Sequence, residues 1–287
     1  MTNPDAGSLG FIGLGVMGAP MCRNLARRAG RPVRSYDRVA TVADVPAMAS
    51  VAALAQDSTI VFLCLPSGLH VQAVATEILA ATDRQVRMIV DMGTSPVAMT
   101  RAMATRVAAD GIVWVDAPIA RTRQAAEDGT LSVMVGATDA DFAMLQPLLG
   151  CMASDVTLCG PVGCGQAVKI LNNMVLVETV AALSEALAIG KSVGLDPAVL
   201  FGTLAKGSAD SFALRNHGMK AMLPGVFPER AFSVAYARKD IGYALELAQG
   251  GGVDAAGAER GAALLDAATK AGWGDLYWPV VVKLLER

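Results

Sequence analysis

The 287-residue sequence has little charge and few aromatic side chains. Charged residues make up 17% of it and aromatic residues 5%, whereas hydrophobic residues make up 53%. The 24 Lys and Arg residues are scattered and are balanced by 26 Asp and Glu residues, so there is no basic face or stripe for a nucleic acid partner. We therefore expect aliphatic cores, and the low charge suggests surface buried between subunits.

Cysteine and histidine are also scarce. The five cysteines include no Cys-x-x-Cys pair, which favours reduced thiols in a cytosolic protein. Neither the cysteines nor the two histidines, His70 and His217, have the spacing of metal ligands, so no metal site is expected. His217 is interpreted as a surface residue of a helical segment and is left out of the predicted site.

Targeting segments are missing as well. The first ten residues contain no charged region followed by an apolar stretch, so no signal peptide is expected. Lys169, Glu178, Glu185 and Lys191 interrupt the most hydrophobic stretch, so no membrane span of about 20 uncharged residues is expected. These absences and the thiols favour a cytoplasmic protein without a membrane partner.

What the sequence does contain is a regular alternation of short apolar runs with helix-length segments. The runs, taken as strands, are LGFIG, PVRSYD, STIVFLCLP, RMIVDMG, IVWVDAP and TLSVMVG. This alternation is typical of βαβ units and predicts an α/β Rossmann domain with a parallel sheet. The chain is also long enough for two domains.

The strand pattern stops near Gly160. Val162–Gly190 is predicted to be one long helix, and the rest of the chain is predicted to be helical with breaks at glycine- and proline-rich segments. We therefore predict a Rossmann domain over residues 1–160 and an all-α domain over residues 161–287, joined by the long helix. Its apolar character favours packing against a second subunit, and hence a homodimer or homotetramer.

A glycine motif follows the first predicted strand. Gly13, Gly15 and Gly18 form Gly-x-Gly-x-x-Gly, enclosing Val16 and Met17, directly before a helix-compatible run. In dinucleotide-binding turns the first glycine permits a tight turn, the second lets the backbone approach the pyrophosphate, and the third allows close packing of helix on strand. A purely structural turn is the alternative, but the position between strand and helix favours a cofactor site.

Two charged residues follow the second predicted strand. Asp37 stands about 20 residues after the glycine motif, where a carboxylate can bind the adenosine ribose hydroxyls and would repel a 2′-phosphate. Arg38 weakens the preference for NAD, because a guanidinium there could stack on adenine or hold that phosphate. We predict NAD as the cofactor, with NADP possible; a solvated Asp-Arg turn is the alternative.

Lys169 and Asn173 lie four residues apart at the start of the predicted long helix. They share one face within about 40°. Hydride transfer at a carbinol carbon needs a proton donor or acceptor for the oxygen, which a partly buried lysine can provide. A pair of solvated surface residues is the alternative, and the apolar, glycine-rich surroundings favour the catalytic interpretation.

The motifs together resemble those of the β-hydroxyacid dehydrogenases, the family of 3-hydroxyisobutyrate dehydrogenase and tartronate semialdehyde reductase. The resemblance covers nearly the whole chain, and its helical part resembles the C-terminal domain of 6-phosphogluconate dehydrogenases. It rests on GFIGLGVMGAPM, on LCLP, on DAP followed by DGTL, on Gly-x-Gly-x-x-x-Lys-x-x-Asn-Asn at residues 163–173, and on RKDIGYALELA.

The resemblance implies roles for individual residues. Lys169 would be the catalytic acid and base, Asn173 would bind substrate, and Lys239 would make a closing contact with the cofactor, with Asp240 as its structural companion. The expected neighbours of the nicotinamide are Leu65, Pro66 and Thr94. The segment DMGTSP is one residue shorter than the common family form, so only its threonine is assigned.

One element departs from the family pattern. Where Val-Ser-Gly-Gly usually follows DAP, this sequence has Ile119–Thr122. Arg121 thus replaces a glycine with a guanidinium able to bind an oxyanion bidentately, and Thr122 could add a hydroxyl. The pair is similar to the element of sulfolactaldehyde reductases, which implies a sulfonate or a distal carboxylate on the substrate. Alternatively, Arg121 pairs with a nearby acid such as Glu127 or Asp128.

The sequence therefore predicts an NAD(P)-dependent dehydrogenase of a small anionic hydroxy acid or aldehyde. A catalytically inactive NAD(P)-binding sensor or scaffold is a second hypothesis, but the intact Lys169 and Asn173 pair argues against it. An imine reductase is a third, and it is disfavoured because those relatives usually lack the lysine.

Overall fold

The computed structural model describes residues 7–229 and 231–285. It contains two compact units, residues 1–169 and 170–287, whereas the sequence prediction divides the chain after residue 160. The prediction about a signal peptide falls largely on residues 1–6, outside the described residues.

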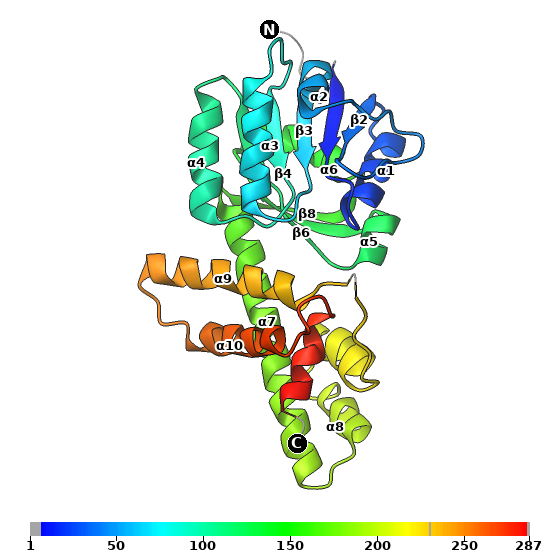
Figure 1. Ribbon diagram of the computed structural model, residues 1–287, viewed down its shortest axis with the longest axis vertical. Helices are drawn as coiled ribbons and strands as arrows, with labels where there is room; N and C mark the ends of the chain where they lie inside the picture. The colour runs from blue at the N-terminus through cyan, green and yellow to red at the C-terminus, as the bar shows by residue number, and fades with distance from the viewer. Residues whose placement is uncertain (1–6, 230, 286–287) are drawn as a thin grey trace. The chain divides into compact units, whose positions relative to one another are not determined.

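In the described part of the first unit, eight strands form one sheet with helices on both faces (Figure 1). The strands are β1 (Ser8–Ile12), β2 (Val33–Tyr36), β3 (Ser58–Leu63), β4 (Met88–Asp91), β5 (Val113–Asp116), β6 (Ile119–Ala120), β7 (Leu131–Gly136) and β8 (Ala153–Gly160). The helices are α1 (Gly18–Arg28), α2 (Val51–Asp57), α3 (Gly68–Ala80), α4 (Val97–Ala108), α5 (Arg123–Asp128) and α6 (Asp139–Leu149). The predicted α/β Rossmann-like domain is confirmed.

The order of strands places the carboxyl ends of β1, β3, β4 and β5 at one edge. These strands and β2 are parallel, in the order β2-β1-β3-β4-β5. The connections after β1 and β3 leave in opposite directions along the sheet, which in such folds creates the crevice that receives a ligand. β7 runs antiparallel to β5 and β6, and β8 pairs with β7. β6 and β8 were not predicted.

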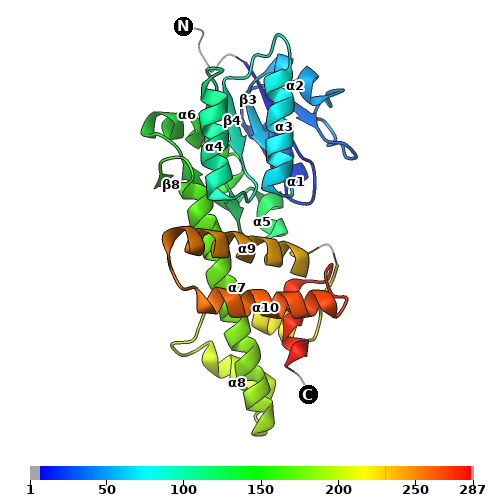
Figure 2. The ribbon, with the colours of Figure 1, turned by 60° about the vertical axis from the view of Figure 1, so that its left-hand side comes forward.

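Each face of the sheet has its own aliphatic core. The helices α2, α3 and α4 cover one face, where α3 and α4 lie side by side (Figure 2). The opposite face packs against α1, α5 and α6. Aromatic contacts are few, as the composition predicts; Phe11 and Phe62 stack on neighbouring strands. The strands carry apolar side chains on both faces because helices cover both.

The second unit is helical, as predicted. The long helix α7 (Cys164–Ser192) begins in the first unit and continues into the second. The others are α8 (Pro197–Leu204), the π-helix η2 (Leu214–Met222), α9 (Val234–Gly251), α10 (Ala256–Lys270) and the 3₁₀-helix η3 (Trp278–Leu284). α9 and α10 run side by side (Figure 1), and the buried faces of all these helices form one core.

The length and composition of α7 would allow it to cross a membrane, despite the charged residues that led us to expect no span. However, 44% of its most apolar window is buried inside the protein. The core helix of a water-soluble domain has the same composition, because it is apolar on most sides.

His217 was predicted to lie at the surface, and this is wrong. It is only 7% exposed and packs within η2 against Tyr277 and Trp278. Its Nδ1 is hydrogen-bonded to the hydroxyl of Tyr277, and burial lowers its pKa to about 4. The prediction failed because the residues that bury His217 lie some 60 positions further along the chain.

Candidate active site

The glycine turn after β1 has the shape that a pyrophosphate site requires. Gly13 has φ +98°, and a Cβ there would lie 2.2 Å from the carbonyl oxygen of Cys64. A Cβ on Gly18 would lie 1.9 Å from the carbonyl oxygen of Gly13. In contrast, nothing lies within 4 Å of a Cβ on Gly15. Gly13 and Gly18 are therefore needed for packing, whereas Gly15 faces open space beside the first turn of α1. A phosphate can approach the backbone there.

Val16 and Met17 lie between these glycines, as the motif requires. Val16 is 48% exposed, whereas Met17 packs against the core beneath α1. Exposure of an apolar side chain at this position is consistent with a surface that a cofactor would cover.

Asp37 follows β2 and connects to the glycine turn. Its carboxylate accepts hydrogen bonds from the backbone N–H of Leu14 (2.7 Å), Val39 (2.9 Å) and Ala40 (3.1 Å). Burial opposes ionisation, but these three bonds outweigh it and hold the pKa of Asp37 below its usual value. Asp37 is thus ionised at neutral pH and has lone pairs left for ribose hydroxyls, and Arg38 beside it is exposed.

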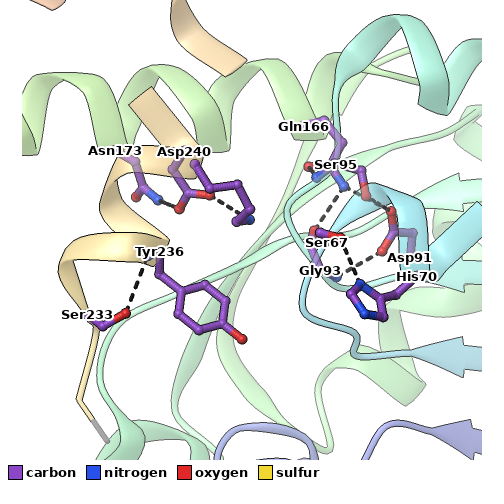
Figure 3. Close-up of polar contacts among 11 residues, drawn as sticks. Ser67, His70, Asp91, Gly93, Ser95, Gln166, Asn173, Ser233, Tyr236 and Asp240 are labelled. Atoms are coloured by element: carbon purple, nitrogen blue, oxygen red, sulfur yellow. Dashed lines mark hydrogen bonds and ion pairs between the residues drawn. The ribbon is translucent and has the colours of Figure 1, made fainter. Parts of the chain in front are cut away.

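The loop after β4 is tied to the first turn of α7 by a buried network (Figure 3). The side-chain oxygen of Gln166 accepts a hydrogen bond from Ser95 N–H (3.0 Å), and its nitrogen donates to Gly93 O (2.9 Å) and to Asp91 Oδ2 (3.3 Å). Asp91 also accepts bonds from Gly93 N–H (2.9 Å) and Ser95 Oγ (2.7 Å). The residues directly before and after Thr94, Gly93 and Ser95, are therefore both fixed by hydrogen bonds.

Asp116, at the end of β5, anchors the same turn of α7. Its carboxylate accepts hydrogen bonds from the backbone N–H of Gly163 (2.7 Å) and Gln166 (2.8 Å). Burial raises the pKa of Asp116, and the backbone bonds only partly oppose this. A Cβ on Gly165 would lie 2.4 Å from the carbonyl oxygen of Met134, so the helix starts in direct contact with the sheet. Sequence reasoning missed Asp116 and Gln166, although both stand within the motifs it used.

Lys169 stands less than one turn beyond Gln166 on α7 and is half-buried. Leu65 and Pro66 follow β3, and a Cβ on Gly93 would lie 2.9 Å from the carbonyl oxygen of Leu65. The loops that carry Leu65 and Thr94 are therefore in contact at the carboxyl edge of the sheet. The structure brings these predicted nicotinamide neighbours together within the first unit.

The second unit holds a separate polar cluster (Figure 3). Asn173 Nδ2 donates a 2.7 Å hydrogen bond to Asp240 Oδ2, and Lys239 Nζ lies 2.8 Å from Asp240 Oδ1 in an ion pair. Asn173 and Asp240 are buried. The ammonium of Lys239 also lies over the rings of Tyr236 and Tyr243. Asp240 thus contacts both Asn173 and Lys239, and its role as a structural companion of Lys239 stays a prediction.

Arg121 adopts a backbone conformation that usually belongs to glycine, with φ +87°. Its guanidinium donates hydrogen bonds to Thr130 O (2.6 Å) and Ser154 Oγ (2.7 Å), and it forms a 2.7 Å ion pair with Asp155. The structure therefore engages Arg121 within its own domain, through an acid other than those considered from the sequence. Binding of a substrate anion stays a prediction and requires the guanidinium to exchange partners.

The neighbours of Arg121 have local contacts. Thr122 Oγ1 accepts a 3.3 Å hydrogen bond from Ala125 N–H and so caps α5. Arg123 is 68% exposed and pairs with Glu127 at 3.0 Å, one turn further along the helix. Thr122 thus serves the fold and remains a predicted substrate ligand.

Among the described residues, no group of three His, Cys, Asp or Glu side chains is arranged to hold a metal ion. His70, one of the two histidines, is hydrogen-bonded to Ser67 at the start of α3, 2.8 Å apart (Figure 3).

Two family models match the chain in succession. Residues 8–160 match the NAD binding domain of 6-phosphogluconate dehydrogenase. Residues 163–285 match the NAD-binding domain of NADP-dependent 3-hydroxyisobutyrate dehydrogenase. Together they cover both the glycine turn and the lysine helix.

Several proteins are similar to this chain over most of their length. A 2-(hydroxymethyl)glutarate dehydrogenase of Eubacterium barkeri is 35% identical over 97% of this chain and 95% of its own. The human mitochondrial 3-hydroxyisobutyrate dehydrogenase is 33% identical over 84% of this chain and 75% of its own. The structure of Mycobacterium tuberculosis 3-hydroxyisobutyrate dehydrogenase with L-serine has a TM-score of 0.85 and 29% identity, covering 98% of this chain and 99% of that one.

Proposed function

The chain belongs to the β-hydroxyacid dehydrogenase family and is an NAD(P)-dependent oxidoreductase, and we propose that its substrate is a short hydroxy acid or aldehyde with a distal anionic group. The distal group is a carboxylate or a sulfonate. Support comes from Arg121 in the segment after DAP. The substrate named for the Eubacterium barkeri relative, 2-(hydroxymethyl)glutarate, likewise has a carboxylate distant from the hydroxymethyl group.

The observation that carries this function is the arrangement at the carboxyl edge of the sheet. The open glycine turn follows β1 there, and buried carboxylates at the ends of β4 and β5 fix the turn of α7 that precedes Lys169. A dinucleotide bound in this turn supplies or accepts the hydride. Gly13, Gly15, Val16, Met17 and Gly18 would hold its pyrophosphate, and Leu65, Pro66 and Thr94 would adjoin its nicotinamide.

We assign the adenosine ribose to Asp37 and Arg38. The ionised carboxylate of Asp37 would accept hydrogen bonds from the ribose hydroxyls and repel a 2′-phosphate, so NAD is the preferred cofactor. The exposed Arg38 lets NADP bind as the weaker alternative.

Lys169 handles the proton. In the reductive direction the carbonyl carbon receives the hydride, the C=O π electrons move onto the oxygen, and the ammonium of Lys169 donates a proton to it. In the oxidative direction the neutral amine accepts the hydroxyl proton as hydride leaves the carbinol carbon. Asn173, oriented by Asp240, has a second N–H on Nδ2 that can hold the substrate oxygen, and Lys239 would make a closing contact with the cofactor.

Substrate binding by Arg121 is an exchange of partners. In the structure Asp155 is the anion that the guanidinium holds. A distal carboxylate or sulfonate would take the place of Asp155, while Thr122 would donate its hydroxyl hydrogen to the same group.

Replacement of Lys169 tests the assignment. Lys169→Ala should lower kcat by orders of magnitude and leave the Kd for NADH nearly unchanged, because the lysine acts on the substrate oxygen. Lys206→Ala, which removes an exposed lysine, is the control and should retain wild-type turnover. Unchanged kcat in Lys169→Ala would contradict the assignment, and cofactor binding without turnover of any short aldehyde would favour a sensor.

We also propose a cytoplasmic homodimer or homotetramer. Val175 and Ile189 on α7 are 57% and 64% exposed, and apolar side chains of a helix are commonly covered in oligomers. Sedimentation velocity should detect the oligomer, and Ile189→Asp should weaken it; a monomeric wild-type protein would contradict this proposal. Cell fractionation tests the location.

A further inference from the structure

The side chain of Gln166 is completely buried, and both ends of its amide are used. Its oxygen faces a donor, Ser95 N–H, and its nitrogen faces two acceptors, Gly93 O and Asp91 Oδ2. Asp91 is the last residue of β4, and Gly93 and Ser95 belong to the loop that follows it. A buried amide with this pairing fixes the distance and direction between two segments, because each bond would be costly to leave unmade.

The turn that carries Gln166 is also fixed from a second strand. Asp116 holds the backbone N–H of Gly163 and of Gln166 itself. Asp91 and Asp116 are register partners on β4 and β5. The ends of β4 and β5 thus both hold the first turn of α7. Asp116 of β5 binds its backbone, and Asp91 of β4 binds the Gln166 side chain.

Lys169 follows Gln166 by three residues. At about 100° per residue the two side chains point within about 60° of each other, so the direction set for Gln166 also sets that of the lysine. Thr94 lies between the two loop residues that Gln166 holds. The rotation of α7 and the position of the expected nicotinamide loop therefore depend on the same amide.

We infer that Gln166 is a positioning residue that fixes the ammonium of Lys169 relative to the loop of Thr94, and so the alignment of proton transfer with hydride transfer. This inference rests on the proposed role of Lys169 as the acid and base. Gln166 itself touches neither substrate nor cofactor in this scheme.

The chemistry of the amide provides a discriminating variant. Gln166→Glu keeps the shape, but an ionised glutamate would face Asp91 Oδ2 and Gly93 O with an acceptor in place of a donor. Protonated, the same side chain can again donate. Burial and the adjacent carboxylate both raise the pKa of such a glutamate above its ordinary value of about 4.3. Other titratable groups around this position are Asp116, Cys64, Cys164, Arg101 and Lys169.

The test compares kcat, KM and the Kd for NADH across pH in the wild type, Gln166→Glu and Gln166→Met. We expect kcat of Gln166→Glu, relative to wild type, to be at least about ten-fold lower at pH 8.5 and to recover towards pH 6, with the Kd for NADH changed less than about three-fold. Gln166→Met, which cannot titrate, should show a loss at every pH. Gln146→Glu, on the exposed side of α6, is the matched control and should follow the wild type.

A kcat ratio for Gln166→Glu that does not vary with pH would overturn the inference, as would a loss confined to NADH affinity. If Gln166→Met does not fold, Gln166→Glu alone decides, because its neutral form can accept from Ser95 N–H and donate one of the two hydrogen bonds that the amide nitrogen makes. Wild-type turnover in Lys169→Ala would instead refute the proposed function, so the two failures are distinguishable.

Discussion

Replacing Arg121 by glycine should selectively impair substrates with a distal anion. A charge-assisted hydrogen-bonded contact contributes about 1.5–3 kcal/mol, which is roughly ten- to a hundredfold in kcat/KM. Part of this is offset, because binding must break the Arg121–Asp155 pair, but an exposed pair of this kind contributes little. We therefore expect a loss of about ten-fold or slightly more in kcat/KM for these substrates.

The same substitution should change stability little. Glycine removes the strain of a φ of +87°, which is worth roughly 1–2 kcal/mol for a side-chain-bearing residue. Against this stand the lost ion pair, which is exposed and weak, and the hydrogen bonds to Thr130 and Ser154. Each of these two hydrogen bonds is worth about 0.5–1.5 kcal/mol. The gains and losses are of similar size, so a selective kinetic effect would not arise from unfolding.

The assay measures oxidation of 2-(hydroxymethyl)glutarate against 3-hydroxyisobutyrate, which lacks the distal carboxylate, and reduction of succinic semialdehyde against butyraldehyde. Arg123→Gly removes an exposed arginine two residues away and serves as the control. Asp155→Asn should raise kcat/KM for the distal-anion substrates, by up to about five-fold. An equal loss for both members of each pair in Arg121→Gly would refute the role of Arg121 as anion contact.

Two further predictions concern the cofactor and the helical domain. Asp37→Ser should shift the ratio of kcat/KM for NAD over NADP towards NADP by about ten-fold or more, because it removes the charge that repels a 2′-phosphate and leaves Arg38 in place; an unchanged ratio would mean that Asp37 does not face the ribose. His217 stays neutral in the folded state down to its pKa of about 4, whereas the unfolded chain takes up the proton near 6.5. The free energy of unfolding is therefore unaffected by His217 above pH 6.5 and decreases as the pH falls from 6.5 towards 4. At pH 5 the decrease amounts to about 2 kcal/mol. Urea unfolding followed by tryptophan fluorescence at pH 7.5 and 5 should show this loss in the wild type and in the control His70→Gln, but much less in His217→Gln; equal pH dependence in His217→Gln would contradict it.

Local patterns in the sequence determined the elements and the motif positions. The alternation of apolar runs identified six of the strands, and the long helix predicted at residues 162–190 lies at Cys164–Ser192. The glycine spacing identified the turn that the structure places after β1. These features depend on residues within a few positions of one another, where turn conformation and helical or strand periodicity dictate the outcome.

Only the tertiary structure decided which distant residues meet. Arg121 was considered against acids within seven positions, but its partner is Asp155, 34 positions away. The contact exists because β6 and β8 both pair with β7. Gln166 meets Asp91 over 75 positions, and Asn173 meets Asp240 over 67.

The physical reason is that strand register and helix packing bring such pairs together, and neither is encoded in short-range spacing. The sequence by itself specified a nucleotide turn and a lysine-bearing helix. Only the folded chain decided how that helix is held against the sheet and that Arg121 pairs with Asp155.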